Sequence, residues 1–316
     1  MEVAAIVLNW RTPAHALRAR AALLADGLAR ERVLLVDNGS GDGSVEALRE
    51  GADGSPVLAL PENVGFARAN NLAARRLPAS GCYLFVNGDA FVHRRGSVAA
   101  LVDAVGRPGA GIAVPRLRNA DLTLQPSVVP LSTPMPELIR ASGLSRLVPN
   151  RLQPNLGTHW DHGRSRRIQA ADGPVLAVEA SVWRAVDGFD ERTVMYGEDH
   201  DLFRRIAVGG YTAWFVAEAE FVHLGGASAT QRWDRAERAQ RVAAAEASMV
   251  AARLSPGRAT MTIALMALGA GGRSLGLSLL GRRPASEVQY AWLRGYLGAL
   301  RGARTPSASA DSSTCP

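Results

Sequence analysis

Three carboxylates crowd into one short stretch of the chain. Residues 195–205 read MYGEDHDLFRR, in which the acidic side chains are Glu198, Asp199 and Asp201. Such carboxylates serve as general bases, as cation ligands, or as favourable charges in the first turn of a helix. Leu202 and Ile206, four positions apart, predict a helix that begins near Glu198 and buries one face. Taken alone, the stretch fits helix capping as well as chemistry.

Four short apolar runs in the first hundred residues predict parallel strands. The runs are Ala4–Leu8, Val33–Val36, Val57–Leu60 and Tyr83–Val86. They lack polar alternation, which is typical of strands covered on both faces. Helical stretches lie between them. The first has Thr12 as cap, Pro13 in its first turn and the apolar positions Leu17, Ala21, Leu24 and Leu28. This alternation predicts an α/β fold with its ligand site beyond the carboxyl ends of the strands.

Polar residues follow each of these strands. The segments are Asn9-Trp10-Arg11, residues 37–44 (DNGSGDGS), residues 62–65 (ENVG) and Asn87-Gly88-Asp89. Each segment by itself fits ordinary turn chemistry. Four such ends in register predict a cleft lined with oxygen acceptors. Asp89 directly follows a buried strand and has no capping role, so it fits a ligand of a hard divalent cation.

In this order and spacing the motifs resemble those of family 2 glycosyltransferases with the GT-A fold. The matching stretches are IVLNW (6–10), VDNGSGDGS (36–44), ENVGFARANN (62–71), FVNGDAFV (85–92), GFDERTVMYGEDHDLFRR (188–205) and FVHLGGAS (221–228). Within the family the chain is most similar to the rhamnosyltransferase-like branch that decorates cell-envelope or secreted glycans. The resemblance implies a mostly parallel central sheet with helices on both faces, plus a C-terminal helical extension.

The resemblance also assigns roles to individual residues. Asp199 takes the place of the catalytic base of an inverting transfer. Glu198 and Asp201 are expected to bind acceptor hydroxyls, to orient Asp199 or to cap the helix. Asp89 and His223 take the places of the ligands for Mn²⁺ or Mg²⁺. Nucleotide-sugar contacts are expected at Asn9, Arg11, Asp37, Asn63, Arg68, Asn71 and Asn87.

Four of these positions also have an ordinary structural explanation. Arg68 also fits a solvated charge, Asn63 a turn, Asn71 a helix surface and His223 a structural hydrogen bond.

The sequence departs from the branch at two places. Gly88 stands where proline is usual, which is expected to loosen the metal loop. Glu179 and Ala180 stand where a basic pair is common. Residues 116–169 are rich in proline and polar residues, and we expect them to carry acceptor-binding loops.

Composition excludes several classes of protein. A chain of 316 residues with 47% hydrophobic content is globular, with room for one large core and a smaller element. Its two cysteines, Cys82 and Cys315, argue against a disulfide framework and for a reducing compartment. The N-terminal MEVAAIVLNW lacks a basic region before a short apolar run, so no signal peptide is expected. We therefore expect a cytoplasmic protein.

The formal charge of +7 is concentrated at one end of the chain. Residues 1–231 hold 24 arginines and 24 acidic residues, whereas residues 232–304 hold 12 arginines and 4 acidic residues. No lysine occurs, which weakens a basic patch as evidence for nucleic-acid binding.

The C-terminal quarter allows three interpretations. Residues 261–280, MTIALMALGAGGRSLGLSLL, are long enough to span a bilayer, but Arg273 and the glycines disfavour spanning. The segment also fits a helical pair packed on the catalytic domain. Its arginines with Trp292, Tyr290 and Tyr296 fit a segment lying on an anionic surface. We expect peripheral association with the inner face of the plasma membrane.

The expected domains follow from these boundaries. Residues 1–231 form the GT-A domain, with a nucleotide-sugar half (about 1–115) and an acceptor half (about 116–231). Residues 232–304 form the basic helical extension, and residues 305–316 a disordered tail.

The favoured function is a metal-dependent inverting glycosyltransferase. By resemblance the leading donor is dTDP-L-rhamnose and the acceptor is a glycan or polyprenyl-linked glycan. The alternative is a non-catalytic sugar-nucleotide or glycan-binding protein on the same scaffold, against which Asp89, Asp199 and His223 argue. A nucleotidyltransferase would need a basic Gly-rich loop near the first strand, and IVLNWRTP offers none.

Overall fold

The computed structural model describes residues 1–129, 133–152, 160–192, 197–225 and 234–302. By its contacts the chain divides into two units. The first contains Met1–Leu131 and Gly143–Trp233, and the second contains Ser132–Ser142 and Asp234–Pro316. Some of the sequence-based predictions fall outside the described residues. These are the expected disordered tail, residues 193–196 of the motif at 188–205, and residues 226–228 of the motif at 221–228.

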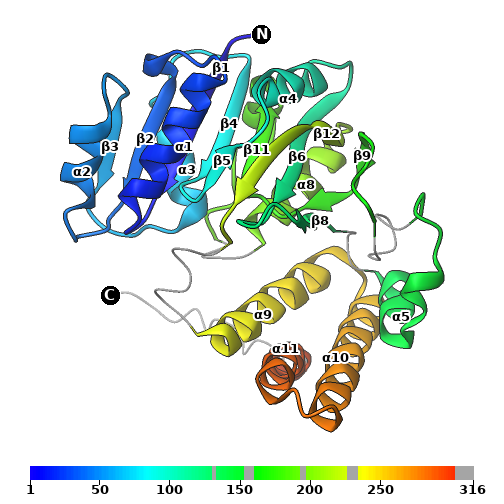
Figure 1. Cartoon of the computed structure of the whole chain (residues 1–316). Helices are drawn as coiled ribbons and strands as arrows, with labels where there is room; N and C mark the ends of the chain where they lie inside the picture. Colours follow the sequence, from blue (N-terminus) through cyan, green and yellow to red (C-terminus); the bar gives the residue numbers. More distant parts are fainter. Residues whose placement is uncertain (130–132, 153–159, 193–196, 226–233, 303–316) are drawn as a thin grey trace, which may run out of the picture. The chain divides into compact units, whose positions relative to one another are not determined.

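A ten-stranded mixed sheet forms the centre of the first unit (Figure 1). Its order is β3-β2-β1-β4-β11-β6-β12-β5, with β7 paired to β6 and β9 to β12. The strands are β1 (Val3–Asn9), β2 (Val33–Asn38), β3 (Val57–Leu60), β4 (Cys82–Asn87), β5 (Ala90–Val92), β6 (Ala110–Arg118), β7 (Leu124–Gln125), β9 (Arg166–Ile168), β11 (Val175–Glu179) and β12 (Thr212–His223). The four strands predicted from the sequence are β1 to β4, and they pair in parallel as expected. A separate small sheet pairs β8 (Val128–Val129) with β10 (Ala170–Ala171).

Helices cover both faces of the sheet, as predicted. They are α1 (Pro13–Ala25), α2 (Ser44–Gly51), α3 (Phe66–Ala74), α4 (Ser97–Val105), α7 (Ala180–Ala185) and α8 (Glu198–Val208). Because neighbouring strand residues point to opposite faces, Ile6 and Phe85 belong to one apolar cluster and Val7 and Leu84 to the other. The first cluster includes residues of α3, α7 and α8, and the second includes residues of α1, α2 and α4.

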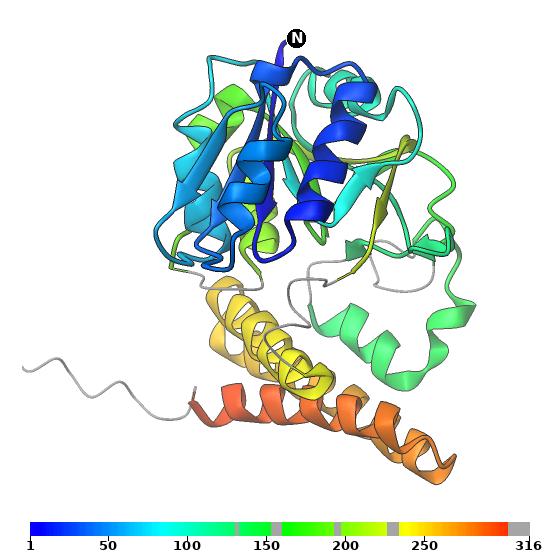
Figure 2. The same cartoon turned by 60° about the vertical axis from the view of Figure 1, so that its left-hand side comes forward.

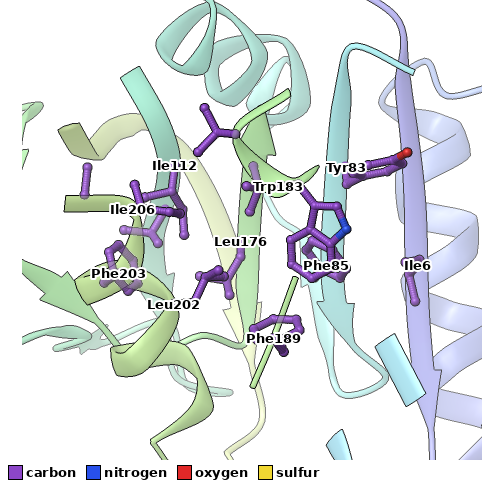
Figure 3. Close-up of a cluster of buried hydrophobic side chains, with 14 of the residues drawn as sticks. Ile6, Tyr83, Phe85, Ile112, Leu176, Trp183, Phe189, Leu202, Phe203 and Ile206 are labelled. Atoms are coloured by element: carbon purple, nitrogen blue, oxygen red, sulfur yellow. The ribbon is translucent and has the colours of Figure 1, made fainter. Parts of the chain in front are cut away.

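Aromatic packing fixes the segment that leads to α8 (Figure 3). The Phe189 ring lies 5.3 Å from the Phe85 ring of β4 and 5.1 Å from the Trp183 ring of α7. Within α8, Leu202 and Ile206 are fully buried, as the sequence predicted. The helix that begins with the acidic turn is therefore held against the sheet by its apolar face.

The expected apolar face of α1 is confirmed in part, because Leu17, Leu24 and Leu28 pack against the second apolar cluster whereas Ala21 does not. Ala21 is exposed, and the buried residues are Ala16, Ala19, Arg20 and Leu23. Arg20 is tolerated there because its guanidinium donates to the Ser55 hydroxyl at 2.7 Å and to the Asp53 carbonyl at 2.9 Å. The helix does begin at Pro13 with Thr12 in the cap position, although the Thr12 side chain makes no capping bond.

The second unit consists of helices (Figure 2). They are α5 (Pro134–Ser142), α9 (Arg235–Arg253), α10 (Pro256–Leu279) and α11 (Arg283–Gly302). Small residues let them approach closely: a Cβ on Gly295 of α11 would lie 2.6 Å from the Cβ of Ala243 of α9. Ile263 and Met266 of α10 are buried in the shared apolar cluster. The expected C-terminal helical extension is thus present.

The boundary expected near residue 231 remains a prediction, and the contact pattern differs from it in one respect. Residues 132–142, which the sequence placed in the acceptor half of the catalytic domain, group with the C-terminal helices. The reason is the packing of α5 on α10, where a Cβ on Gly269 would lie 3.5 Å from the Cα of Ala141.

Candidate active site

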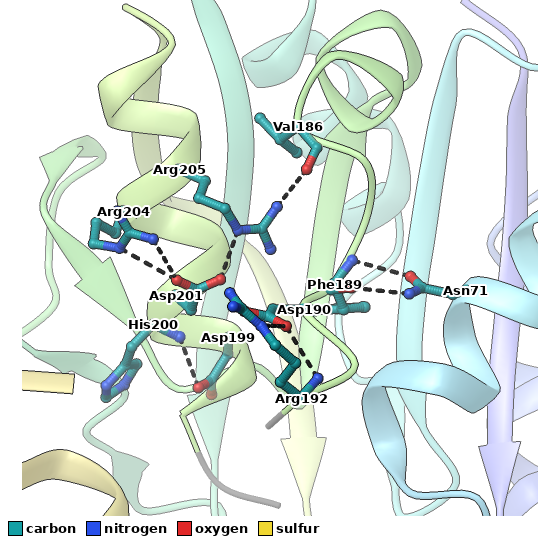
Figure 4. Close-up of polar contacts among 10 residues, drawn as sticks. All are labelled: Asn71, Val186, Phe189, Asp190, Arg192, Asp199, His200, Asp201, Arg204 and Arg205. Atoms are coloured by element: carbon teal, nitrogen blue, oxygen red, sulfur yellow. Dashed lines mark hydrogen bonds and ion pairs between the residues drawn. The ribbon is translucent and has the colours of Figure 1, made fainter. Parts of the chain in front are cut away.

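Asp199 lies in the first turn of α8, where its carboxylate is held by two backbone donors, of which His200 is drawn in Figure 4. Oδ1 accepts from the His200 N–H at 2.8 Å, and Oδ2 accepts from the Gly173 N–H at 2.9 Å. Gly197 caps the helix with φ of 101°, a conformation that favours glycine. The carboxylate is half-buried and fixed in direction, as a positioned base requires.

The surroundings make Asp199 a stronger base than an ordinary aspartate. Burial raises its pKa, and the nearby Asp172 charge raises it further, whereas His200 and the two backbone donors act in the opposite direction. A general base works best when its pKa approaches the working pH. The raised pKa of Asp199 therefore suits proton abstraction.

Glu198 differs from its neighbour because it is buried. Burial, with the adjacent Asp199 charge, raises the pKa of Glu198 to about 8. Its Oε2 atom is buried and has no hydrogen-bond partner among the described residues. The raised pKa favours the protonated, neutral form of Glu198, which lowers the negative charge of the turn. Acceptor binding by Glu198, expected from the sequence, remains a prediction.

Asp201 is engaged by its own helix. Its carboxylate accepts from Arg204 at 2.8 Å and from Arg205 at 2.6 Å, one turn further along α8. These i,i+3 and i,i+4 pairs give Asp201 a structural explanation. Acceptor binding by Asp201 remains a prediction that its contacts do not favour.

Asp172 is a neighbour of the base that the sequence analysis missed. It precedes β11, and its Oδ1 lies 3.3 Å from Nε2 of His200. Ligand atoms of Asp172, Asp199 and His200 lie within 4.8 Å of one another, which makes them a possible cation site. A cation there would occupy the base, so this group competes with catalysis by Asp199. No periodic pattern marks Asp172, because it lies in the irregular segment between β10 and β11.

The structure brings Asp89 and His223 together from opposite ends of the first unit's sequence. Asp89 follows β4 and is 6% exposed, and His223 ends β12. Asp89 Oδ1 lies 3.4 Å from His223 Nε2. Pairing of β12 with β5 creates the contact, since His223 lies opposite Ala90.

Gln125 of β7 orients the imidazole of His223, and sequence reasoning also missed it. The His223 Nδ1 atom lies 2.8 Å from Oε1 of Gln125, and the Gln125 amide donates to the His223 carbonyl at 3.2 Å. With the amide placed this way, Nδ1 donates to Gln125, and Nε2 faces Asp89 either with its lone pair or with a proton.

This arrangement fits a divalent cation. Two lone-pair atoms facing each other at 3.4 Å repel unless a cation or a proton lies between them. Two ligands of one octahedral cation, each at roughly 2.1 Å, are separated by about 3 Å. A histidine that donates its other N–H to an oxygen is also the usual second shell of a metal ligand. The residues therefore fit the expected Mn²⁺ or Mg²⁺.

The expectation that Gly88 loosens this loop is wrong. The Gly88 N–H donates to the Leu8 carbonyl at 2.8 Å, a bond that proline could not make. A Cβ at position 88 would lie 2.8 Å from the same carbonyl oxygen. Gly88 thus fastens the Asp89 loop to β1. The neighbouring Asn87 ends β4 half-buried, and its nucleotide-sugar role remains a prediction.

Asn9, Arg11 and Asp37 lie together at the ends of β1 and β2, as predicted for one pocket. Asn9 and Asp37 are opposite each other in the parallel register, and the Asn9 amide donates to Asp37 at 2.7 Å. Ser40 donates its hydroxyl and its N–H to the same carboxylate, at 2.6 and 2.9 Å. Arg11 in turn donates its N–H to the Ser40 hydroxyl at 2.8 Å. Asp37 is fully buried, so here it organises the loop, and contact with a nucleotide base remains a prediction.

Asn63 shapes the loop after β3, in agreement with one of its two interpretations. The Asn63 side-chain oxygen accepts from the Gly65 N–H at 3.1 Å and from the Asn38 amide at 3.3 Å. The Asn38 side-chain oxygen in turn accepts from the Val64 N–H at 3.0 Å. Gly39 permits this approach, because a Cβ there would lie 2.4 Å from the Asn63 backbone nitrogen.

Asn71 is neither a free ligand donor nor a helix-surface residue. It is buried, its amide donates to the Phe189 carbonyl at 2.9 Å, and its oxygen accepts from the Phe189 N–H at 3.0 Å (Figure 4). Asn71 thus clamps the segment before α8. Arg68 is largely exposed, 3.9 Å from Glu191, so contact with a diphosphate remains a prediction.

Family membership follows from these features together with one comparison. Residues 12–172, just over half of the chain, match the model of Glycosyl transferase family 2. The chain belongs to this family, whose members transfer a sugar from a nucleotide donor.

Two relatives are similar over more than half of the chain. Both are described as N-acetylglucosaminyl-diphospho-decaprenol L-rhamnosyltransferase, from Mycobacterium tuberculosis strains CDC 1551 / Oshkosh and ATCC 25618 / H37Rv. Each is 32% identical over 222 residues, covering 62% of this chain and 68% of the relative.

Solved structures support the fold. A mannosyltransferase from Pyrobaculum calidifontis, in complex with GDP-Man and Mn²⁺, superposes with a TM-score of 0.59 at 17% identity. The match covers 95% of this chain and 87% of that one. GalNAc-T7 with UDP, GalNAc and Mn²⁺ has a TM-score of 0.52 at 13% identity, covering 70% of this chain and 43% of that one. The predicted GT-A type fold is thereby confirmed.

Proposed function

We propose that this glycosyltransferase is an inverting rhamnosyltransferase. It transfers L-rhamnose from a nucleotide-diphosphate donor, with dTDP-L-rhamnose the leading candidate, to a hydroxyl of an N-acetylglucosaminyl-diphospho-polyprenol. The observation that carries this proposal is the 32% identity over 222 residues to two enzymes of that described activity. The placement of Asp199, Asp89 and His223 supports an enzyme over a non-catalytic binding protein.

The reaction requires one proton acceptor on the acceptor side. Asp199 takes the proton of the acceptor hydroxyl while that oxygen forms a bond to the anomeric carbon. The bond from the anomeric carbon to the diphosphate oxygen breaks, and the nucleoside diphosphate leaves with the electron pair. The Gly173 and His200 N–H groups keep the carboxylate aimed during this step.

Asp89 and His223 would hold the cation, with Gln125 fixing the imidazole. When bound, Mn²⁺ or Mg²⁺ would neutralise charge on the departing diphosphate. Burial of Asp89 on the Gly88 turn keeps this carboxylate fixed at the end of β4.

A donor panel tests the proposal. The purified full-length protein is incubated with dTDP-rhamnose, UDP-glucose, UDP-N-acetylglucosamine and GDP-mannose, each with Mn²⁺ and a detergent-soluble N-acetylglucosaminyl-diphospho-lipid. We expect transfer from dTDP-rhamnose and, by NMR, inversion of the anomeric configuration in the product. Preference for another donor would overturn the rhamnosyl assignment. Binding of a donor without transfer or hydrolysis of any would favour the non-catalytic alternative.

A further inference from the structure

Helix α10 carries apolar residues on two faces, and among the described residues only one of these faces packs within the second unit. The inner face, with Ile263, Met266 and Ala270, is buried against α9 and α11. The opposite face is exposed along the helix. Its members are Met261, Ala264, Leu268, Gly272, Leu275 and Leu279, called here the α10 stripe.

The spacing and exposure of the α10 stripe make it one continuous surface. Steps of three or four residues keep its members on one side of an α-helix over roughly 27 Å. Leu268, Leu275 and Leu279 are 67%, 63% and 80% exposed. A single exposed leucine is common on protein surfaces, but three on one face of a helix form an apolar patch. Cβ atoms on Gly272 and Gly276 would meet nothing within 4 Å, so packing within the described residues does not explain these glycines.

The chain segment that contains the α10 stripe carries only basic charges, although Asp234, Glu237 and Glu287 line the same hollow as Leu275. Residues 247–286 contain five arginines and no acidic residue. Arg258 precedes the stripe by one turn, Arg282 and Arg283 follow its end, and all three are exposed. Basic side chains that bracket an exposed apolar face are the pattern of helices that lie in the interface of an anionic bilayer.

We propose that the α10 stripe, with Arg258, Arg282 and Arg283, is a docking surface for an anionic lipid bilayer on which α10 lies parallel to the membrane plane. A second copy of the chain fits less well. In a coiled coil between two copies of α10, Met261, Leu268 and Leu275 would occupy the a positions of the heptad repeat. The d positions would then hold Ala264, Gly271 and Ser278, whose small side chains leave voids in the interface. The arginines would also find no acidic partner in this segment of a second copy.

Spanning is also disfavoured by the packing. One described helix, α10, has the length and mean hydropathy (1.2) of a membrane span. Core helices of soluble proteins pass the same test. Spanning would strip the inner face of α10 from α9 and α11.

Vesicle flotation with the full-length protein tests the proposal. We expect binding to vesicles of phosphatidylcholine with phosphatidylglycerol at low salt, and much weaker binding to phosphatidylcholine alone or at high salt. Leu268→Ser/Leu279→Ser should lower the partition coefficient roughly tenfold or more. The matched control Val208→Ser changes an apolar residue that is 79% exposed on the first unit, and it should bind like the wild type.

A second pair of variants tests the charge. Arg282→Gln/Arg283→Gln should lower binding by roughly tenfold or more, because each basic residue near an anionic surface contributes about a fivefold factor. The control variant Arg49→Gln/Arg76→Gln removes the same charge from exposed sites of the first unit, and it should bind vesicles like the wild type.

Three outcomes would overturn the docking surface. These are no flotation of the wild type at low salt, a leucine double variant that binds fully, and a dimer in light scattering that the leucine variant dissociates. Release by detergent alone, and not by salt or carbonate, would show spanning instead. Transfer to the detergent-soluble acceptor is measured on the same samples, so failure of membrane binding is distinguished from failure of the proposed activity.

Discussion

At the scale of single residues, the acidic turn separates its three carboxylates by their surroundings. Asp199 is half-buried between two backbone donors, Glu198 is buried with a pKa raised to about 8, and Asp201 is paired with arginines. Only Asp199 combines a fixed direction with a raised pKa. Environment, rather than residue type, therefore makes Asp199 the candidate base among the three.

Asp199→Asn removes the proton acceptor while keeping the size of the side chain. We expect turnover to fall by roughly 10² to 10⁴, with donor affinity nearly unchanged, because the base acts on the acceptor hydroxyl. Initial rates and donor calorimetry on one sample decide this. The comparison variant Asp201→Asn should lose far less activity, and the reverse order would move the base to Asp201.

Gly173→Ala tests the positioning of the base without touching its chemistry. A Cβ at residue 173 would lie 2.9 Å from the Asp199 Cβ and 3.3 Å from Oδ2, so Asp199 must shift. Small displacements of a catalytic group are costly, and we expect kcat to fall by roughly tenfold to a hundredfold. Gly257→Ala, where a Cβ meets nothing within 4 Å, is the control. Equal rates for both variants would show that the Gly173 contact does not position the base.

Glu198→Gln should change how stability depends on pH. The folded-state pKa of about 8 lies above the ordinary 4.5, so the folded protein holds a proton that the unfolded chain loses between these values. The wild type therefore loses stability as pH rises from about 4.5 to about 8, and the Gln variant escapes this loss. We expect the free energy of unfolding of the variant, relative to wild type, to rise by on the order of 1 to 4 kcal/mol across this range. Denaturant titrations at both ends of the range measure it, and parallel pH profiles would contradict the buried, protonated Glu198.

At the scale of elements, the candidate cation site depends on strands that are distant in sequence. Asp89 follows β4, His223 ends β12 and Gln125 lies on β7. The β12 pairing with β5 and the hydrogen bond to Gln125 bring the three together. The Mn²⁺ affinity of the site should therefore depend on Gln125, which is not itself a ligand.

Gln125→Ala should weaken Mn²⁺ binding by roughly 10-fold to 100-fold, the usual effect of losing the partner that orients a metal-bound histidine. Asp89→Asn and His223→Ala should weaken Mn²⁺ binding more than Gln125→Ala does. The control Asp103→Asn changes an exposed carboxylate of α4 and should leave Mn²⁺ binding unchanged. Mn²⁺ titrations in the presence of nucleoside diphosphate, followed by electron paramagnetic resonance, give the affinities. Full transferase activity in excess chelator would refute a required cation.

At the scale of the whole molecule, α5 joins two stretches of sequence that are far apart. It is inserted within the chain of the first unit, yet it packs on α10 with Pro136 and Glu137 buried. Loss of the C-terminal helices should therefore expose α5, which lies in the middle of the sequence.

Deleting residues from 256 onward should expose α5 while leaving the sheet intact. We expect faster amide exchange at residues 134–142, unchanged exchange in β1 and β4, and retained donor hydrolysis. A deletion from residue 303 onward removes neither α10 nor α11 and is the control. If α5 stays protected in the shorter protein, its packing on α10 does not hold it.

Local pattern was a reliable guide to several elements. Apolar runs of four or five residues predicted β1 to β4, and the spacing of Leu202 and Ile206 predicted α8 with its buried face. It failed where a residue's partner is distant in sequence. Asn71 and Phe189 are 118 positions apart, and His223 and Gln125 are 98 apart, so no local spacing reveals either contact.

The sequence by itself determined the parallel strands, the order of the polar strand ends and the family, because these depend on short-range apolar periodicity and on motifs in series. Only the tertiary structure decided that Asp201 is paired with arginines while Asp199 is held by backbone donors, that Gly88 ties its loop to β1, and that Asp172 and Gln125 border the two sites. Burial and hydrogen bonding set these properties, and both arise from packing between segments that the chain keeps far apart.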